Sequence, residues 1–335
     1  MRKIVAAGSI LVDKINEIDA YPKAGELTQI RSLAQVPGGL VPNTGCDIHI
    51  LDPDIPVCAF GAVGDDDLGR FAVSELARRG LDTAGVVVKR GATSFTDVMS
   101  VAAASCERTF FTYPGASADW GYDDFPFGRV NAGDIVLLGY FLLLAKVDAG
   151  DGRRILKELK ARGAETAIDL VSENSDRYGL VRDVLPFVDH LIVNETEAAR
   201  IAGLPATADL KTVARALLDL GVQRRVIIHL PAKGVSLRRD GTWTEVPSCD
   251  LPCGFIKGKT GAGDAYCAGA LVGIYRGLSE AEILTCGATA AVGALSACGA
   301  TDGMRPLADL RAWIAGGFAF SKESRTVVDS AVERL

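Results

Sequence analysis

The sequence has no long hydrophobic run. Its longest apolar segment, residues 135–145, is about half as long as a membrane-spanning helix. The apolar stretch after Met1 stops at Asp13 without a small-residue cleavage site, which favours a buried first strand over a signal sequence. We therefore expect neither a membrane-spanning segment nor a membrane partner.

Basic residues are not in excess, and paired cysteine motifs are missing. Lys and Arg total 36 against 42 Asp and Glu, and the net charge of -6 argues against a nucleic-acid partner. Of the eight cysteines, only Cys249 and Cys253 approach the spacing of metal ligands, and no second pair or His partner follows them. We therefore expect no zinc site, buried reduced thiols and a cytoplasmic location.

Linkers and internal repeats are also missing, so the 335 residues predict a single domain, 1–335. Core-strand patterns alternate with helical patterns, which indicates an α/β fold with a doubly wound, mostly parallel sheet. The expected core strands are residues 4–7, 57–63, 134–144, 165–170, 188–194 and 225–230. A polar segment at 16–36 and an alternating hairpin at 93–113 depart from this pattern. We expect a small β lid formed by about 12–36 and 91–115.

The segment that carries most chemical information is the helix entry Gly261-Ala262-Gly263-Asp264. A turn of such small residues lets backbone N–H groups converge, and the positive end of the following helix points to the same place. Both features favour a bound phosphate. A carboxylate at a helix start is stable in its ionised form and can accept a proton. We interpret Asp264 as a base beside a transferring phosphoryl group.

Three other interpretations of this stretch were weighed. Residues 254–260 resemble a Walker A loop, but three residues separate its glycines where four are needed. A dinucleotide fingerprint would need glycine where Tyr266 stands. A plain glycine-rich helix entry with a capping Asp264 remains an alternative.

Further candidates follow other expected strands. Asp13 falls just beyond the first strand, where ligands bind in open α/β sheets, and Gly38-Gly39 opens a helix with Asn43 one turn further on. A turn aspartate and a plain glycine turn are the alternatives at these positions. Arg108 lies in the lid hairpin among aromatic residues, where a substrate contact competes with simple aromatic packing.

Nucleotide and metal candidates lie in the second half of the chain. Asn194 and Glu197 are three residues apart at a helix start, which suits a hydrated magnesium ion bound with nucleotide phosphates, although an acidic helix start explains them equally. Lys233 and Gly234 follow the expected strand at 225–230, again at a ligand-facing end.

In this order the motifs resemble a ribokinase-like, PfkB-type carbohydrate kinase over nearly the whole chain. The G-A-G-D helix entry is the most specific of them. The resemblance implies ATP-dependent phosphotransfer to a hydroxymethyl group of a small sugar, with Asp264 as general base and the N–H groups of Gly261, Ala262 and Gly263 holding the developing charge. It also implies Mg²⁺ bound mostly through water, and a possible homodimer through the lid. The substrate contacts it implies are Asp13, Gly38, Gly39, Asn43 and Arg108.

Two departures from the resembled pattern concern the nucleotide side. Gly258-Lys259 stand where similar kinases carry Asp-Thr, and that aspartate helps to form a monovalent-cation site in them. We expect the Lys259 ammonium group to supply part of the positive charge that the monovalent cation provides in those kinases, or to contact the ATP phosphates. His229-Leu230-Pro231 replace Thr-Leu-Gly, which affects the grip on the nucleotide and the choice of phosphate donor.

The sequence leaves the acceptor open. A nucleoside also offers a ribose hydroxymethyl group, so a nucleoside kinase is an alternative within the same enzyme class. A catalytically weak sugar-binding regulatory protein is an alternative from another class, although the intact segment from Gly261 to Asp264 argues against it. Recognition of the sugar is expected to involve Tyr140 and the lid.

Overall fold

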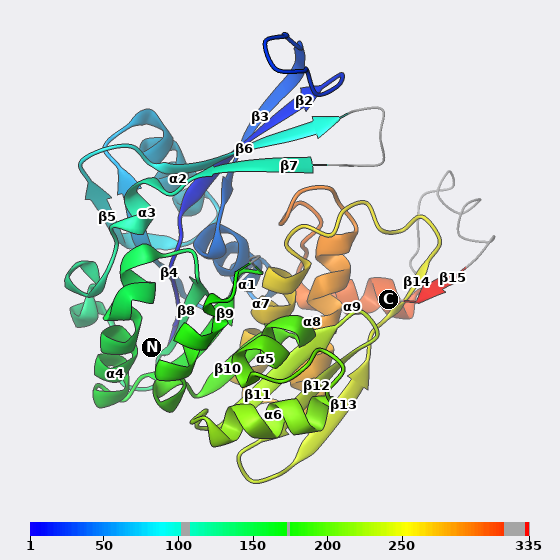
Figure 1. Ribbon diagram of the computed structural model, residues 1–335. Coiled ribbons are helices and arrows are strands. Elements are labelled where there is room, and N and C mark those ends of the chain that lie inside the picture. The colour runs from blue at the N-terminus through cyan, green and yellow to red at the C-terminus, as the bar shows by residue number, and fades with distance from the viewer. Residues whose placement is uncertain (102–107, 173–174, 318–331, 335) are drawn as a thin grey trace.

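The computed structural model describes residues 1–101, 108–172, 175–317 and 332–334. A nine-stranded sheet forms the centre of the molecule (Figure 1). In spatial order its strands are β13 (Trp243–Pro247), β12 (Lys233–Arg238), β11 (Arg225–Leu230), β10 (His190–Asn194), β9 (Glu165–Leu170), β8 (Ile135–Phe141), β1 (Ile4–Ala7), β4 (Val57–Gly64) and β5 (Asp82–Lys89). All pairs are parallel except β11–β12 and β12–β13. The predicted doubly wound, mostly parallel sheet is confirmed.

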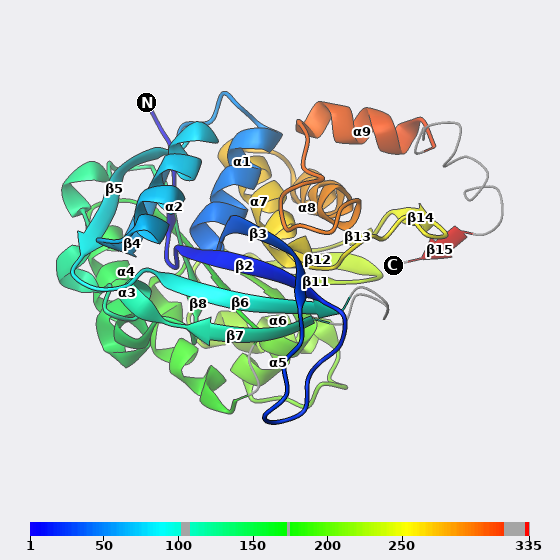
Figure 2. The ribbon, with the colours of Figure 1, turned by 90° about the horizontal axis from the view of Figure 1, so that it is seen from above.

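Helices cover both faces of this sheet (Figure 2). One face carries α1 (Cys46–Leu51), α2 (Asp67–Arg78), α7 (Ala262–Tyr275), α8 (Glu280–Leu295) and α9 (Leu307–Ala315), and the other carries α4 (Gly152–Ala161), α5 (Glu195–Ala202) and α6 (Leu210–Asp219). Successive strand residues point to opposite faces, so Ile4 and Ala6 join the first core and Val5 and Ala7 the second. Both faces of the central strands are therefore buried beneath helices.

A second, four-stranded sheet stands off the main body, as Figures 1 and 2 show. Its order is β3 (Ile30–Gly38), β2 (Leu11–Ile18), β6 (Ser94–Val101) and β7 (Arg108–Tyr113). We call it the small sheet. Both segments expected to form a lid contribute its strands. The hairpin residues 102–107, including the predicted turn from Ser105 to Glu107, lie outside the described residues.

Strands β5, β12 and β13 were missing from the sequence prediction. Each carries exposed or half-buried positions, and β5 and β13 are the two edges of the large sheet. Edge strands need no continuous apolar run, so the pattern that identifies core strands is weak there. Asp13 lies within β2, the strand that follows β1. Lys233 and Gly234 begin the antiparallel strand β12, opposite Leu230 and His229 at the carboxyl end of β11.

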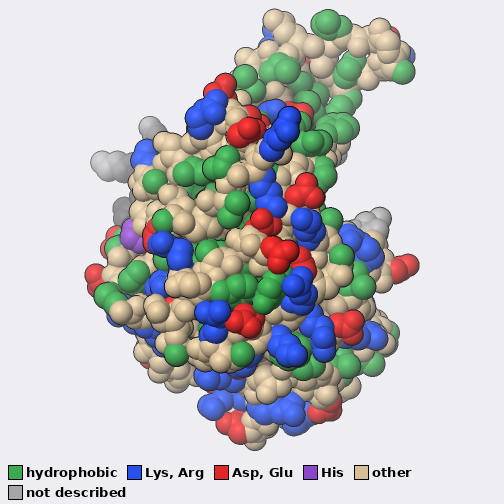
Figure 3. All heavy atoms as spheres, turned by 90° about the vertical axis from the view of Figure 1, so that its left-hand side faces the viewer, with side chains coloured by type: hydrophobic (Ala, Val, Ile, Leu, Met, Phe, Trp, Pro, Cys, Tyr) green, Lys and Arg blue, Asp and Glu red, His purple; other side chains and the backbone are tan. Residues whose placement is uncertain are grey.

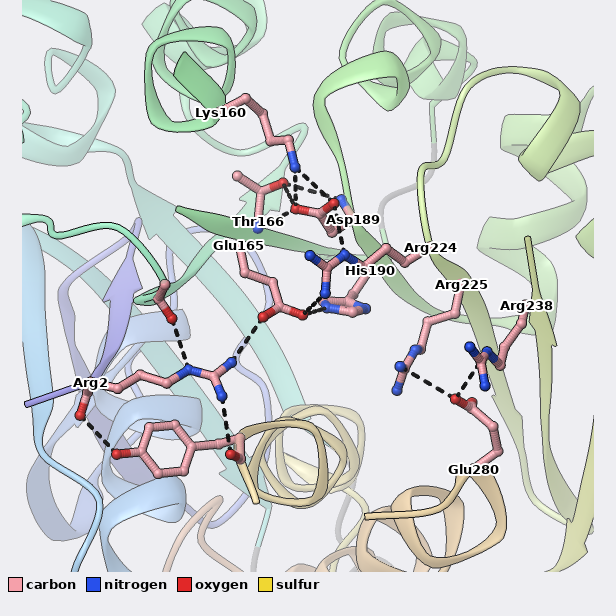
Figure 4. A network of polar contacts seen from close by, with 12 residues as sticks. Arg2, Lys160, Glu165, Thr166, Asp189, His190, Arg224, Arg225, Arg238 and Glu280 are labelled. Carbon is pink, nitrogen blue, oxygen red and sulfur yellow. Dashed lines mark hydrogen bonds and ion pairs between the residues drawn. The ribbon is translucent and has the colours of Figure 1, made fainter. Parts of the chain in front are cut away.

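A polar network joins the amino ends of several central strands (Figure 4). Glu165 accepts hydrogen bonds from Arg2 and Arg224 and contacts the buried ring of His190 at 2.6 Å. Burial opposes ionisation of Glu165, but His190 and the two guanidinium groups outweigh it and lower its pKa to about 2. The network lies at the amino ends of these strands, opposite their carboxyl ends. It therefore ties the strands together without occupying the end of the sheet where ligands bind. No helix in the described part of the chain is long and apolar enough to cross a membrane.

Candidate active site

The site is built around the first turn of α7. Gly261 caps this helix with φ 79°, in the left-handed region, and a Cβ there would lie 2.7 Å from the carbonyl oxygen of Ala300. Glycine is therefore required both by the backbone angle and by the available space. Because the first N–H groups of a helix have no partner within it, this turn offers donors to an anion. Of the predicted donors, Ala262 N–H already makes a 3.3 Å bond to the carbonyl of Lys259.

Asp264 follows in the same turn and is buried, with 8% of its surface exposed. Asn43 Nδ2 and the Tyr140 hydroxyl each donate a hydrogen bond of 2.9 Å to its Oδ2. Burial raises the pKa of Asp264 to about 6, and the side chains of Asn43, Tyr140 and Thr44 oppose the rise. The carboxylate is therefore mostly ionised at pH 7 and still basic enough to take a proton.

Asn43 is positioned by the glycine pair that precedes it. Gly38 ends β3 where a Cβ would collide with the Asp13 carboxylate, and Gly39 has φ 90° and a Cβ there would lie 2.8 Å from the Ser9 carbonyl oxygen. Asn43 N–H then donates to the Gly39 carbonyl in the short π-helical turn Val41–Gly45. The predicted substrate residues Asp13, Gly38 and Gly39 thus lie together where the small sheet meets the main body, and Asn43 contacts the Asp264 carboxylate.

Three more carboxyl groups surround Asp264. Asp169 ends β9 and Glu197 lies in the first turn of α5, and both line one pocket of about 260 Å³ with Asp264. Asp47 on α1 is fully buried and outside that pocket. Burial raises the pKa of each of these three groups, and the charge of Asp264 adds to the rise. Sequence analysis missed Asp169, although it ends a predicted core strand as ligand-binding residues often do.

Asn194 and Glu197 form a reciprocal cap at the start of α5. Asn194 Oδ1 accepts from the Glu197 N–H at 2.9 Å, and Glu197 Oε2 accepts from the Asn194 N–H at 3.1 Å. Glu197 Oε1 accepts from the Ser172 hydroxyl at 2.7 Å. The capping explanation and the ligand explanation are therefore compatible, because a carboxylate oxygen with one hydrogen bond retains a second lone pair.

These residues fit a hydrated magnesium ion. Asn194 and Glu197 both line the small pocket, where a hydrated cation would meet their side-chain oxygens through its waters. Among the described residues no group of three or more His, Cys, Asp or Glu is arranged to hold a metal directly. That donor set suits Mg²⁺, which keeps several waters and takes further oxygens from phosphates.

A larger pocket of about 660 Å³ adjoins the first, with Asn194, His229 and Gly263 lining both. Lys259, Pro231 and Tyr266 also line it. The His229 ring stacks on Tyr266 with centroids 4.9 Å apart, and burial lowers the pKa of His229 to about 4. The imidazole is therefore neutral at working pH and can donate one N–H toward an anion at the helix start.

Two predicted nucleotide residues lie apart from this pocket. Lys233 pairs with Glu245 at 2.7 Å across β12 and β13, and it is not among the residues that line the larger pocket. A Cβ at Gly234 would collide with the Tyr266 hydroxyl, so the lack of a side chain at Gly234 leaves room for the Tyr266 ring. Arg108 starts β7, and its side chain lies outside the described residues.

An open α/β sheet with adjoining pockets at its carboxyl end, a glycine-rich helix start and a buried carboxylate is an arrangement that suits phosphoryl transfer. The model of the pfkB family carbohydrate kinases matches residues 1–306, and the chain belongs to this family of carbohydrate kinases.

Individual relatives agree with this assignment. The chain is 26% identical over 305 residues to a ribokinase of Arabidopsis thaliana, covering 86% of this chain and 74% of that protein. It is 22% identical over 325 residues to a 5-dehydro-2-deoxygluconokinase of Shouchella clausii, covering 93% and 95%. The fold matches that of Arabidopsis thaliana ribokinase complexed with ribose and ATP, with a TM-score of 0.79, 24% identity and coverage of 96% and 100%. A nucleoside kinase of Methanocaldococcus jannaschii has the same fold, with a TM-score of 0.72, 18% identity and coverage of 94% and 99%.

Proposed function

We propose that the protein transfers the γ-phosphoryl group of ATP to a hydroxymethyl group of a small sugar. The observation that carries this proposal is the buried Asp264, held by Asn43 and Tyr140 through Oδ2 alone, at a glycine-rich helix start beside the larger pocket. The other carboxylate oxygen, Oδ1, is left to receive the hydroxyl proton. The acceptor oxygen then attacks phosphorus as the proton leaves.

The surrounding residues would divide the remaining work. N–H groups of the Gly261–Gly263 turn and the neutral His229 ring lie where charge develops on the transferring group. Magnesium, when bound beside Glu197 and Asn194, would neutralise negative charge on the phosphate oxygens. Asp13, Gly38 and Gly39, at the base of the small sheet, would bind sugar hydroxyls. Closure of the small sheet over the acceptor would exclude water from the phosphoryl group.

A coupled assay of ADP formation over a panel of sugars and nucleosides tests this function. We expect turnover with at least one small sugar, and product analysis should place the phosphate on a hydroxymethyl carbon. Turnover with nucleosides alone would make the protein a nucleoside kinase. Binding of a sugar without ADP formation under any condition would contradict the proposal and favour a regulatory protein.

Lys259 is expected to replace a monovalent cation on the nucleotide side. Its exposed side chain lines the larger pocket, while a Cβ at Gly258 would lie 3.0 Å and 3.1 Å from the carbonyl oxygens of Ala297 and Cys298. A carboxylate at position 258 would therefore face carbonyl oxygens. Exchanging sodium for potassium at fixed ionic strength should change kcat by less than about twofold, and Lys259→Ala should raise the KM for ATP about tenfold, as expected for loss of a charge-assisted phosphate contact.

The exposed Lys257, two residues away, supplies the matched control. Lys257→Ala should leave the KM for ATP unchanged. A many-fold rise in rate with potassium, or equal effects of the two alanine variants, would contradict this role of Lys259.

We further propose that two copies pair through the small sheet. Its edge strands are β3 and β7, and the exposed fractions of Leu27, Leu33, Phe110 and Phe111 are 90%, 66%, 56% and 57%. Hydrophobic side chains are visible on this projecting part in Figure 3. Apolar side chains on unpaired sheet edges favour association with another sheet. Pairing with an identical copy buries the exposed apolar side chains of both copies.

Sedimentation equilibrium measures this association. The parent should have twice the mass of the 35.2-kDa chain, and Leu33→Asp should be monomeric. Leu180, which is 45% exposed outside the small sheet, gives the control: Leu180→Asp should remain dimeric. A monomeric parent would contradict the proposal.

A further inference from the structure

Tyr140 is a residue to which sequence analysis assigned only sugar recognition. Its hydroxyl donates a 2.9 Å hydrogen bond to Oδ2 of Asp264, the same oxygen that Asn43 holds. Burial raises the pKa of the Tyr140 phenol, so the group stays protonated and acts as a donor throughout the working range. Two donors on one oxygen fix the plane of the carboxylate and leave its other oxygen for the substrate.

The backbone that carries Tyr140 is in an unusual conformation. Tyr140 and Leu142 have φ of 58° and 78°, in the left-handed region that bulky residues seldom adopt. Both lie at the end of β8, where the chain leaves the sheet. Such backbone strain persists only where surrounding contacts hold it, and it gathers at functional sites.

Polar contacts from three other segments hold this strand end. The Tyr140 N–H donates to Asp169 Oδ1 at 3.1 Å, and the Leu142 N–H donates to Asp148 Oδ1 at 2.8 Å. Arg177 donates to the Leu142 carbonyl and pairs with Asp148 at 3.5 Å. Several polar contacts therefore hold the strained backbone in place, and this conformation turns the Tyr140 side chain toward Asp264.

Gly139 completes the arrangement. A Cβ at this position would collide with the carboxylate of Asp169 and with the side chain of Leu40. Only glycine lets Asp169 approach closely enough to hold the next N–H. The contacts around Tyr140 thus form a continuous connection from β9 to the catalytic carboxylate on α7.

We propose that Tyr140 is a positioning residue for the transfer reaction. It directs Oδ1 of Asp264 at the acceptor hydroxyl and stabilises the ionised form of the base, and the strained end of β8 exists to deliver its phenol to that point. This inference rests on the proposed function, because it assigns Tyr140 a role only if Asp264 acts as the base.

The Tyr140→Phe variant tests the inference because it removes one hydroxyl and keeps the ring. Loss of a hydrogen bond to the charged form raises the pKa of a carboxyl group. We expect the acid limb of the kcat/KM profile, which reports the free enzyme, to move up by about one pH unit from near pH 6. Below pH 6, kcat/KM for sugar should fall about tenfold and above pH 8 by less than about threefold, while the KM for sugar stays within twofold.

Other titratable groups near Asp264 do not confuse the comparison. They are Asp47 on α1, Asp169 on β9, Glu197 on α5, Cys267 on α7 and His229 on β11. All five are present in both the parent and the variant, so the Tyr140 hydroxyl is the only group that differs between the two profiles. Thermal unfolding of both proteins at pH 7 shows whether folding itself has changed.

Tyr275→Phe is the matched control. Tyr275 is the last residue of α7, the helix that carries Asp264, and it lies far from the pockets. Its hydroxyl donates a 2.7 Å hydrogen bond to the Arg2 carbonyl, so Tyr275→Phe also removes one short hydrogen bond. Its pH profile should coincide with that of the parent. An unmoved acid limb in Tyr140→Phe, or a raised KM for sugar with unchanged kcat, overturns the inference and makes Tyr140 a substrate contact. Retained turnover in Asp264→Asn would instead overturn the proposed function, so the two failures are distinguishable.

Discussion

Asp264→Asn is expected to lower kcat by about 10²–10⁴-fold, because the variant loses the base that takes the hydroxyl proton. Asparagine has nearly the same shape and can still accept through its carbonyl oxygen the hydrogen bonds that Asn43 and Tyr140 donate to Oδ2. Folding and ATP binding should therefore be retained. Steady-state kinetics on the identified sugar, with ATP affinity measured by calorimetry, separates lost chemistry from lost binding.

Asp47→Asn provides the control for this substitution. Asp47 is buried like Asp264 and lies outside both pockets, and burial raises its pKa. An amide of nearly the same shape there leaves the lining of both pockets in place, so kcat should stay within about threefold of the parent. Undiminished turnover in Asp264→Asn would exclude Asp264 as the base, whatever the control shows.

Gly261→Ala is expected to lower kcat by about 10²–10³-fold, the usual cost of a misplaced donor to a developing negative charge. The added Cβ meets Ala300 at 2.7 Å, where both side chain and backbone stand in the way, so the turn has to move. The N–H groups of this turn then point away from the phosphoryl group. The KM for sugar should change little, because the proposed sugar contacts lie on other elements.

Gly277→Ala separates this geometric effect from the general cost of replacing a left-handed glycine. Gly277 follows the same helix at its other end, has φ 67°, and a Cβ there would have nothing within 4 Å. It should lose about 1 kcal/mol of stability, the cost of a left-handed alanine, with kcat unchanged. A Gly261→Ala variant that keeps full kcat would contradict the anion-binding role of the turn.

Local patterns in the sequence were sufficient for the fold class and for part of the site. Apolar runs alternating with amphipathic helices predicted the mostly parallel sheet, since burial on both faces requires continuous apolar strands. The glycine turn before Asp264 predicted an anion-binding helix start, because these residues are adjacent in the chain and their backbone preferences act locally. The Asn194–Glu197 spacing predicted a ligand pair or an acidic helix start, and α5 does begin there with Glu195 and Glu197 in its first turn.

Only the tertiary structure decided which groups meet Asp264 and what they do to it. Asn43 and Tyr140 are 221 and 124 residues away in sequence, and both reach the same oxygen only because the end of β8 and the turn after β3 come together at the first turn of α7. The pKa near 6 follows from burial, which no spacing of residues reveals. Lys233 stands near the expected strand end, but it begins the antiparallel strand β12 and pairs with Glu245 on β13. Sequence patterns record what neighbouring residues prefer, whereas contacts between distant residues depend on how the strands and helices pack.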